Sequence, residues 1–369
     1  MNVPKLRFKE FNDEWTKEYA GNLCSIQTGK SNTQDKVDDG IYPFYVRSKI
    51  VEKSHKYIFD TEAVLTVGDG VGVGKVFHYI NGKFDCHQRV YMMNNFKNIT
   101  AKYFYYIFSR DFDKRVMKMT AKTSVDSVRY EMIDKMEIYY PTIKEQDKVA
   151  RTLELLDKKI ELQTKKIEDL KLFKKGLNKN IFSNFNAKYK VDELIKEYNK
   201  KTSKNNQFEV LSSTANGIIL QNEYFNKQAA SLDNTGYKIV PFGFITYRSM
   251  SDTGEFHFNI QNITENGIVS PAYPVFEINE DIVDKTYFIY YINENKSFKN
   301  KILSLKEGGT RYALSMSKFK EINLDLPPLE YQKKYSKLLN TYNRKIKNEE
   351  NKLNKLQELK KGLMQNMFV

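Results

Sequence analysis

The sequence predicts an α+β fold in which two mixed α/β domains are joined by two long helices that pair as an antiparallel intramolecular coiled coil. Three observations predict it. A long segment in the middle of the chain is repeated at its end, both copies carry a heptad pattern, and each copy follows a stretch of short strand-like runs. The predicted parts form a pseudo-two-fold repeat: a first domain at 1–140, a central helix at 141–183, a second domain at 184–326 and a final helix at 327–369.

The repeat aligns residues 138–183 with 324–369 without a gap. It is clearest near the end of each copy, where LKLFKKGLNKNIF at 170–182 matches LQELKKGLMQNMF at 356–368. The identical pairs include Pro141 and Pro327, Gln146 and Gln332, Ile160 and Ile346, Leu170 and Leu356, and the tetrapeptides Lys174-Lys175-Gly176-Leu177 and Lys360-Lys361-Gly362-Leu363. Chance does not explain an ungapped match of this length, so we infer an internal duplication.

Apolar residues recur in both copies with alternating spacings of four and three, which is the pattern of a coiled-coil seam. The seam positions of the first copy are Val149, Leu153, Leu156, Ile160, Gln163, Ile167, Leu170, Lys174, Leu177 and Ile181. Those of the second copy are Tyr335, Leu339, Tyr342, Ile346, Glu349, Leu353, Leu356, Lys360, Leu363 and Met367. The polar interruptions fall at equivalent places, and such residues typically fix register and partner at some cost in stability.

The alternative is that each helix lies on its own domain. A helix of about 34 residues is about 50 Å long, which is more than a domain of this size would cover, so pairing of the two helices is favoured. Each helix is predicted to begin just after a proline, Pro141 or Pro327–Pro328, where the preceding strand must stop.

The segments between the helices contain short strand-like runs. In the first domain these are 63–68, 75–81 and 84–93, with Asn81-Gly82 predicted as a hairpin turn. In the second domain they lie at 208–213, 237–248, 255–260 and 270–278. AKYFYYIF at 101–108 and KTYFIYYI at 285–292 each open a helix, and a polar loop and a last strand follow before the long helix. The two domains therefore share their ends and differ in between.

Composition favours a polyanionic partner. The chain has 369 residues and a net charge of +14, from 60 Lys and Arg against 46 Asp and Glu. Neutralising phosphates releases condensed counterions, so this excess favours nucleic acid, although a Lys-rich surface alone would give the same number. Cys24 and Cys86 are the only cysteines and lack metal-site spacing, which fits a reducing cytoplasm. No apolar run is long enough for a membrane span, and the N-terminal residues lack the pattern of a secretory signal.

The layout itself suggests how such a chain would read DNA. Antiparallel helices would place two different domains at opposite ends of a rod, and paired readers of one DNA face are spaced by a helical turn of about 34–36 Å. Two diverged reading heads on one chain would read an asymmetric, bipartite sequence.

These features resemble the specificity subunit of type I restriction–modification systems. The resemblance is carried by the layout, by the Pro-x-x-x-x-Gln entry and Lys-Lys-Gly-Leu exit of each helix, and by segments similar to target recognition domains at 64–76, 237–248 and 267–276. It spans nearly the whole chain. The sequence departs from the family pattern at Tyr331, where an acidic residue often stands, whereas Glu145 keeps that residue in the first copy.

The resemblance implies a cytoplasmic, DNA-binding subunit without catalysis or cofactor of its own. Its two target recognition domains would each read one half of a split target, and the coil would set the gap between the halves. Its partners would be double-stranded DNA, two adenine-N6 methyltransferase subunits that use S-adenosylmethionine and, where present, restriction subunits that use ATP and Mg²⁺.

The candidate base-reading residues lie in or next to loops and mostly carry polar side chains, which suit hydrogen bonds to base edges. In the first domain they are Arg47, Ser48, Lys49, Lys122, Thr123 and Ser124. In the second they are Tyr247, Arg248, Ser249, Gly309, Thr310, Arg311 and Tyr312. The candidate partner-docking residues, near the ends of the long helices, are Lys174, Lys175, Gly176, Lys360, Lys361 and Gly362. Their glycines would permit close approach of another chain, but helix-end charge and capping would explain the same residues.

Several motifs do not support an enzyme. VGDGVGVGK at 67–75 lacks the first glycine and the Ser/Thr of a phosphate-binding loop, and the run after it is strand-like. It is either a turn that lets backbone approach a ligand such as DNA, or a structural hairpin. Cys24, His55, His78, Cys86 and His87 match no zinc-site spacing, and no motif for amino-group methylation or Ser-His-Asp catalysis is present. The rival hypotheses are a coiled-coil scaffold that joins two protein-binding domains without DNA, and an enzyme such as a hydrolase.

Overall fold

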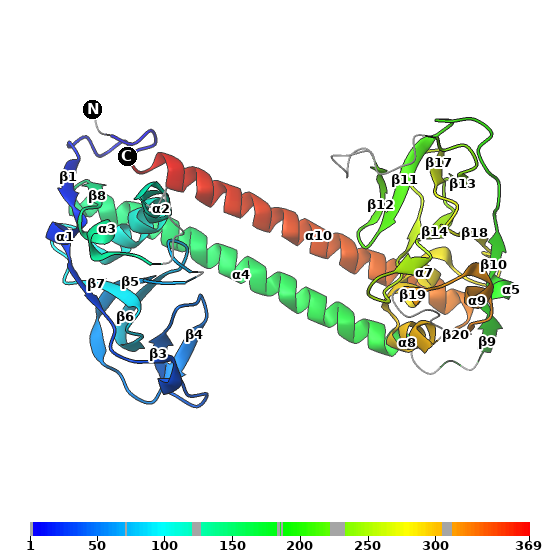
Figure 1. The fold of residues 1–369 in the computed structure, drawn as a ribbon, viewed down its shortest axis with the longest axis horizontal. Helices are drawn as coiled ribbons and strands as arrows, with labels where there is room; N and C mark the ends of the chain where they lie inside the picture. The colour runs from blue at the N-terminus through cyan, green and yellow to red at the C-terminus, as the bar shows by residue number, and fades with distance from the viewer. Residues whose placement is uncertain are drawn as a thin grey trace. The chain divides into compact units, whose positions relative to one another are not determined.

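The computed structural model describes residues 3–70, 72–119, 127–182, 185, 187–221, 233–304 and 312–369 (Figure 1). The chain divides into two compact units. The first unit consists of Met1–Lys165 and Glu350–Val369, and the second unit of Lys166–Glu349. Both long helices, α4 (Ile143–Ile181) and α10 (Leu329–Asn366), therefore contribute residues to both units.

The first unit is built on a six-stranded sheet with the order β2-β7-β5-β6-β3-β4. Its strands are β2 (Ser25–Thr28), β7 (Val90–Asn94), β5 (Phe59–Val67), β6 (Phe77–Cys86), β3 (Tyr42–Tyr45) and β4 (Val51–Ser54), and a 3₁₀ turn, Thr33–Asp35, lies between β2 and β3. Neighbouring strands are antiparallel except β3 and β6, which are parallel.

The prediction of a hairpin turn at Asn81-Gly82 is wrong. Strand β6 runs straight through both residues, and they pair with Glu62 and Thr61 of β5. Gly82 adopts a φ of 128°, which the pairing tolerates because glycine lacks a Cβ. Continued pairing with the long strand β5 outweighs the local turn preference, and the chain reverses instead in the Gly-rich segment between β5 and β6.

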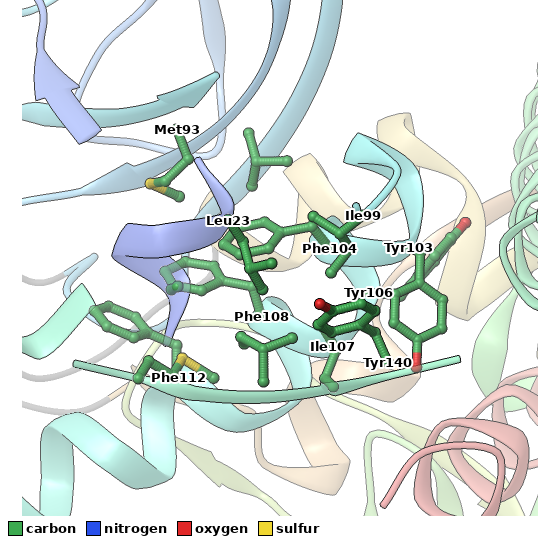
Figure 2. Packing of buried hydrophobic residues seen from close by; sticks show 14 of the residues in the cluster. Leu23, Met93, Ile99, Tyr103, Phe104, Tyr106, Ile107, Phe108, Phe112 and Tyr140 are labelled. Carbon is green, nitrogen blue, oxygen red and sulfur yellow. The ribbon is translucent and has the colours of Figure 1, made fainter. Parts of the chain in front are cut away.

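The core of the first unit forms between this sheet and helix α2 (Ala101–Met119), as Figure 2 shows. Phe104, Phe108 and Phe112 follow one another at four-residue spacing on one face of α2, and all three are completely buried. Their rings stack, with centroids 5.3 Å apart for the first pair and 4.4 Å for the second. The spacing places these aromatic side chains above one another on the helix, so α2 forms because it presents a continuous apolar ridge to the sheet.

The second unit contains different sheets. One four-stranded sheet has the order β10-β18-β14-β16, formed by Ile195–Glu197, Val275–Ile278, Ile245–Tyr247 and Phe258–Ile260. The other has the order β12-β11-β17-β13, formed by Gly217–Leu220, Glu209–Thr214, Asn266–Val269 and Lys238–Pro241. Strands β15 (Met250–Ser251) and β19 (Tyr312–Ala313) form a separate short antiparallel pair. Helices α7 (Lys285–Glu294) and α8 (Lys296–Ser304) lie between β18 and β19 in the chain.

Around these different sheets the two units repeat the same framework. In the first unit, β1 (Thr16–Tyr19) pairs antiparallel with β8 (Glu137–Tyr140), accompanied by α1 (Ala20–Leu23) and α3 (Tyr130–Asp134). In the second, β9 (Ala187–Lys190) pairs antiparallel with β20 (Asn323–Leu326), accompanied by α5 (Val191–Leu194) and α9 (Met316–Lys320). The duplication inferred from sequence therefore extends beyond the long helices to the strands and short helices that precede them.

At the end of each long helix a phenylalanine ring packs against a tyrosine ring, and the two tyrosines are equivalent in the repeat. In the second unit, the ring of Phe182, just after α4, lies 5.8 Å from that of Tyr287. In the first unit, the ring of Phe368, just after α10, lies 5.2 Å from that of Tyr103. Tyr103 and Tyr287 occupy equivalent positions in the two aromatic motifs, so each helix begins in one unit and ends against the other repeat's framework.

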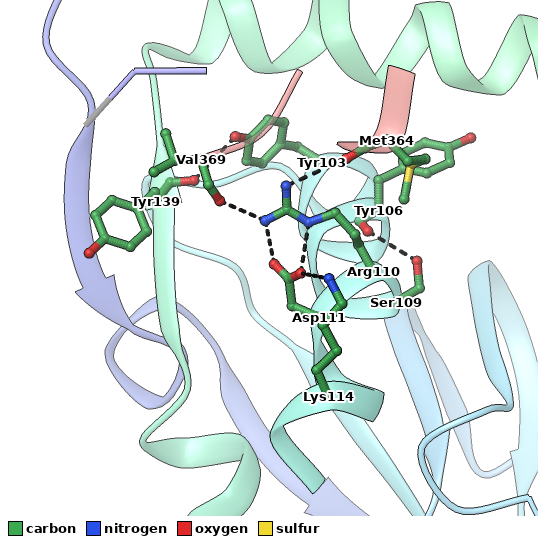
Figure 3. Close-up of polar contacts among 9 residues, drawn as sticks. All are labelled: Tyr103, Tyr106, Ser109, Arg110, Asp111, Lys114, Tyr139, Met364 and Val369. Atoms are coloured by element: carbon green, nitrogen blue, oxygen red, sulfur yellow. Dashed lines mark hydrogen bonds and ion pairs between the residues drawn. The ribbon is translucent and has the colours of Figure 1, made fainter. Parts of the chain in front are cut away.

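An arginine of α2 holds the residues at the end of α10 in the first unit (Figure 3). The Arg110 side chain donates to the backbone oxygens of Val369 at 2.7 Å and Met364 at 3.5 Å. Asp111 orients the guanidinium through its carboxylate, and the Phe368 ring lies 5.1 Å beneath it. These contacts fix the residues at the end of α10 against α2.

The seam positions predicted from the heptad pattern are all buried or half-buried, while Leu155, Leu162, Leu172 and Leu359 lie off the seam and are exposed. In the second unit, Lys166 pairs with Glu349 at 3.1 Å, and the ring of Phe173 stacks on that of Tyr342. Moving forward along α4 thus means moving backward along α10, so these two helix segments run antiparallel. Pairing over the full length of both helices stays a prediction.

Candidate nucleic-acid interface

The glutamine of the Pro-x-x-x-x-Gln motif is a buried bracket in the first unit. Gln146 is completely buried in the first turns of α4. Its Nε2 donates to the backbone oxygens of Pro141 at 2.9 Å and Asn98 at 3.0 Å, and its Oε1 accepts from the backbone N–H of Thr100 at 2.8 Å. One side chain therefore ties the start of α4 to the turn that begins α2.

Gln332 repeats this arrangement in the second unit, where it is 1% exposed. Its Nε2 donates to the backbone oxygens of Pro327 at 2.8 Å and Ile282 at 3.3 Å, and its Oε1 accepts from the N–H of Asp284 at 2.9 Å. The motif thus fixes the start of each long helix to the segment that begins an aromatic helix, α2 in the first unit and α7 in the second.

Two of the predicted docking residues have contacts within the chain. In the first unit, Lys360 pairs with Asp157 and lies 5.9 Å from the ring centroid of Tyr106. In the second, Lys174 pairs with Glu294 at 2.8 Å and lies 5.6 Å from the ring centroid of Tyr290. Tyr106 and Tyr290 are equivalent in the repeat, so the polar seam positions hold the helices to their own units through matching lysine–tyrosine contacts.

The other docking candidates are more accessible. Lys175, Gly176 and Lys361 are exposed, and Gly362 is half-buried. Beyond its chain neighbours and the nearby backbone of its own helix, a Cβ added to Gly176 or Gly362 would meet no atom within 4 Å. Packing among the described residues therefore does not require glycine at either position, although glycine weakens a helix interior.

The Gly-rich segment of the first unit packs directly against two neighbouring stretches of backbone. The Gly68 N–H donates to the Arg89 carbonyl at 2.7 Å, and a Cβ on Gly68 would lie 2.7 Å from that oxygen. A Cβ on Gly72 would lie 3.2 Å from the Arg47 carbonyl oxygen. The segment also receives a hydrogen bond from the N–H of Val128 to the Gly68 carbonyl, at 2.7 Å. The glycines thus serve close backbone approach within the protein.

This packing brings an acidic and two basic side chains together. Arg47 Nη1 lies 3.2 Å from Asp69 Oδ1, and Arg89 Nε lies 3.8 Å from Asp69 Oδ2. His87 lies nearby, and its pKa is lowered, first by burial and then by the Arg47 guanidinium, which keeps the ring neutral. Sequence reasoning found Arg47 but missed Arg89 and Asp69. The signal that could have found them was the run of glycines, because it implies close approach of other segments.

Other first-unit candidates lie near this cluster in the chain. Lys49 is exposed, and Ser48 is half-buried with its hydroxyl donating to the Ile50 carbonyl at 3.1 Å. Lys122, Thr123 and Ser124 lie outside the described residues. The segment that follows them does reach the cluster, because Ser127 forms a β-bridge with Asp69.

In the second unit, Arg248 and Ser249 line a pocket of about 420 Å³ together with Gln221, Tyr237 and Tyr273. Ser249 Oγ donates to the Ala272 carbonyl at 2.6 Å, and Gln221 Oε1 is buried without a hydrogen-bond partner in the described structure. Burial raises the pKa of the Tyr273 hydroxyl, which remains protonated. The pocket therefore offers both donors and an unused acceptor.

Strand β19 pairs Tyr312 with Ser251 and Ala313 with Met250. Because Met250 lines the pocket, Tyr312 lies next to the pocket wall. The structure thus brings together two segments that the sequence predicted separately, 247–249 and the end of the 306–315 loop. Gly309, Thr310 and Arg311 lie outside the described residues.

The prediction that Tyr247 contacts DNA is wrong. Its side chain is completely buried, its hydroxyl donates to the Leu314 carbonyl at 3.2 Å, and its ring lies 4.3 Å from that of Phe258. Side chains alternate between the faces of a strand, so Tyr247 at the end of β14 points into the core while Arg248 is exposed.

The described residues hold no group of three or more His, Cys, Asp or Glu side chains able to bind a metal ion. Cys24 and Cys86 are buried free thiols, and burial raises the pKa of Cys24 to about 12. Among the helices that the structure describes, none has the length and apolar character needed to cross a bilayer.

Comparisons with known proteins agree with this architecture. A family described as type I restriction modification DNA specificity domain matches residues 12–172 and 180–358, once for each repeat. The chain is 22% identical to the MjaVIII specificity subunit of Methanocaldococcus jannaschii, over 95% of this chain and 91% of that protein. It is 24% identical to the EcoDI specificity subunit of Escherichia coli, over 60% of this chain but only 46% of that protein.

The fold is also similar to solved structures. A type I restriction–modification S subunit from M. genitalium superposes with a TM-score of 0.67 at 18% identity, covering 100% of this chain and 99% of the other. A chain from a structural study of complex assembly and conformational transition in the type I R-M system gives a TM-score of 0.55 at 12% identity, covering 98% and 99%.

The duplicated framework around different sheets, together with these matches, places the chain in the class of type I restriction–modification DNA specificity proteins. The chain belongs to the family of type I restriction–modification DNA specificity subunits.

Proposed function

We propose that the chain reads a bipartite, asymmetric DNA target, one half with each unit, and that the two long helices set the gap between the halves. The observation that carries this is the identical framework around different sheets: the brackets at Gln146 and Gln332 repeat, whereas the six-stranded sheet and the two four-stranded sheets do not. Two different heads on one chain suit a target with two different halves.

The length of the helices supports the ruler role. Helix α4 has 39 residues, which corresponds to about 58 Å. The proposed coiled coil can therefore span more than one turn of B-DNA, which rises about 34 Å per turn. Its antiparallel direction is supported by the contacts that Lys166 and Phe173 make in the second unit.

In the proposed complex this chain has no catalytic role. It positions two adenine-N6 methyltransferase subunits, and restriction subunits where present, and these partners supply the sites for S-adenosylmethionine, ATP and Mg²⁺. The net charge of +14 supports duplex DNA as a further partner. A protein scaffold without DNA is the alternative. Steep salt dependence of duplex binding by the assembled complex would support the proposal, and salt-independent or absent binding would favour the scaffold.

Arg248→Ala is expected to reduce discrimination at one half of the target by about tenfold and leave the other half unchanged, since a well-placed arginine discriminates bases by a bidentate contact. The measurement is methylation of a library in which each half is randomised in turn. Lys196→Ala is the control, because Lys196 is an exposed cation on β10 that does not line the pocket. Equal weakening of both halves would make Arg248 a phosphate anchor and contradict its role in reading.

The open glycines provide a test of partner docking. Gly176→Ala and Gly362→Ala are each expected to stabilise the isolated chain by about 0.5–1 kcal/mol, because nothing nearby obstructs the added methyl group. If these faces dock methyltransferase subunits, the same changes weaken assembly, measured by titrating the subunits in analytical ultracentrifugation. Asn354→Ala, at an exposed position of α10, controls for helix propensity. Unchanged assembly in both glycine variants would remove these positions from the docking surface.

A further inference from the structure

The Arg47–Asp69–Arg89 cluster of the first unit joins three separate segments of chain. Arg47 follows β3, Asp69 follows β5, and Arg89 precedes β7. Both arginine side chains are well exposed, at 49% and 65%, whereas the Asp69 side chain between them is only 23% exposed. The carboxylate is therefore the inner member of the cluster, and the two guanidinium groups face solvent.

The backbone around Asp69 is held on both sides. Gly68 is hydrogen-bonded to the Arg89 carbonyl and to the Val128 N–H, and Asp69 itself bridges to Ser127. No side chain larger than hydrogen fits at Gly68, because its Cβ would lie 2.7 Å from a backbone oxygen. The Gly-rich segment thus holds the Asp69 carboxylate in a fixed position beside Arg47 and Arg89.

The charges of the cluster decide what it suits. Two arginines and one aspartate leave a net positive charge, and the neighbouring His87 is kept neutral by burial and by Arg47. An aspartate reduces the attraction for a polyanion, so the cluster does not suit a site that acts by net charge alone. A hydrogen-bonded carboxylate restrains a guanidinium, which matters for directional, bidentate recognition. Asp69 accepts such a bond from Arg47 at 3.2 Å, and it attracts Arg89 by charge at 3.8 Å.

We propose that Asp69 is a positioning residue that holds Arg47 and Arg89 as an oriented pair of guanidinium groups for base edges in the half-site of the first unit. Guanine is the base that this chemistry fits, because its O6 and N7 acceptors match the arginine fork in the major groove. The inference rests on the proposed function, and it adds Asp69 and Arg89 to the residues that determine specificity.

The test uses the complex assembled with its methyltransferase subunits and a DNA library randomised in the half-site of the first unit. Asp69→Asn is expected to lower the preference for guanine at one or two positions about tenfold, while binding to non-specific duplex stays equal or becomes tighter because a negative charge is lost. Arg89→Lys keeps the charge but removes the fork, so it is expected to give the same loss of preference.

Asp60→Asn is the matched control, because Asp60 is an exposed carboxylate on β5 whose charge acts on Lys83. It makes the same change in net charge and is expected to leave base preference unaltered. If Asp69→Asn fails to fold, Arg89→Lys carries the test alone. Undiminished guanine preference, or equal weakening on all sequences, in folded Asp69→Asn or in Arg89→Lys would overturn the inference. Absence of any preference in the parent complex would instead overturn the proposed function.

Discussion

Gln146→Leu is expected to destabilise the first unit by about 3 kcal/mol and to leave the second unit intact. The substitution removes three hydrogen bonds from a completely buried position. It leaves the Thr100 N–H and the carbonyls of Asn98 and Pro141 without that partner. Each buried polar group left without a partner costs about 1–3 kcal/mol, so the sum is a large part of the stability of one unit. Hydrogen exchange measured by mass spectrometry should show lost protection in α2 and in the first turns of α4.

Gln332→Leu is the reciprocal variant, because Gln332 makes the equivalent bonds in the second unit. It is expected to expose α7 and the start of α10 to exchange while α2 stays protected. Gln357→Leu, at an exposed position of α10, should change neither unit. If either buried glutamine variant loosened both units equally, the brackets would not act locally, and the division into two separately stabilised frameworks would be wrong.

Inserting seven residues in each long helix is expected to lengthen the gap in the DNA target by about three base pairs. The insertions are placed between Lys165 and Lys166 in α4 and between Glu349 and Glu350 in α10, where the chain passes from one unit to the other. Seven residues add about 10.5 Å of helix, and a base pair of B-DNA rises about 3.4 Å. A full heptad also keeps the seam residues on one face, so the paired helices are expected to remain paired.

A four-residue insertion at the same two places is the matched control, because it breaks the heptad phase while adding length. It is expected to abolish selective methylation instead of shifting the gap. A heptad variant that methylates the parental target with the parental gap would remove the ruler role from the helices.

The long helices were predictable because their periodicity is local. The predicted helix segments at 141–183 and 327–369 compare with Ile143–Ile181 and Leu329–Asn366 in the structure. Proline and the heptad pattern mark these boundaries in the chain itself. The function of Gln146 within the repeated motif was not predictable, because its partners at Asn98 and Thr100 are distant in sequence.

The sheets and the candidate interface depend on pairing between distant segments, which the sequence does not display. Nothing local indicates that β3 lies parallel to β6, or that β6 continues through Asn81-Gly82. Tyr247 and Arg248 are adjacent and equally plausible by residue type, and only the direction of β14 separates a core residue from an exposed one. Arg89 and Asp69 are separated in the sequence, and only the packing of the Gly-rich segment against the segments of Arg47 and Arg89 brings them together.

We propose that one chain carries two different reading heads at a fixed separation along DNA. The most direct measurement is the position of N6-methyladenine in random duplex DNA treated with the assembled parent complex and S-adenosylmethionine, read by single-molecule sequencing. We expect a motif of two unlike halves with one constant unspecified gap. An uninterrupted motif, a palindrome, or halves that recombine at variable gaps would contradict it.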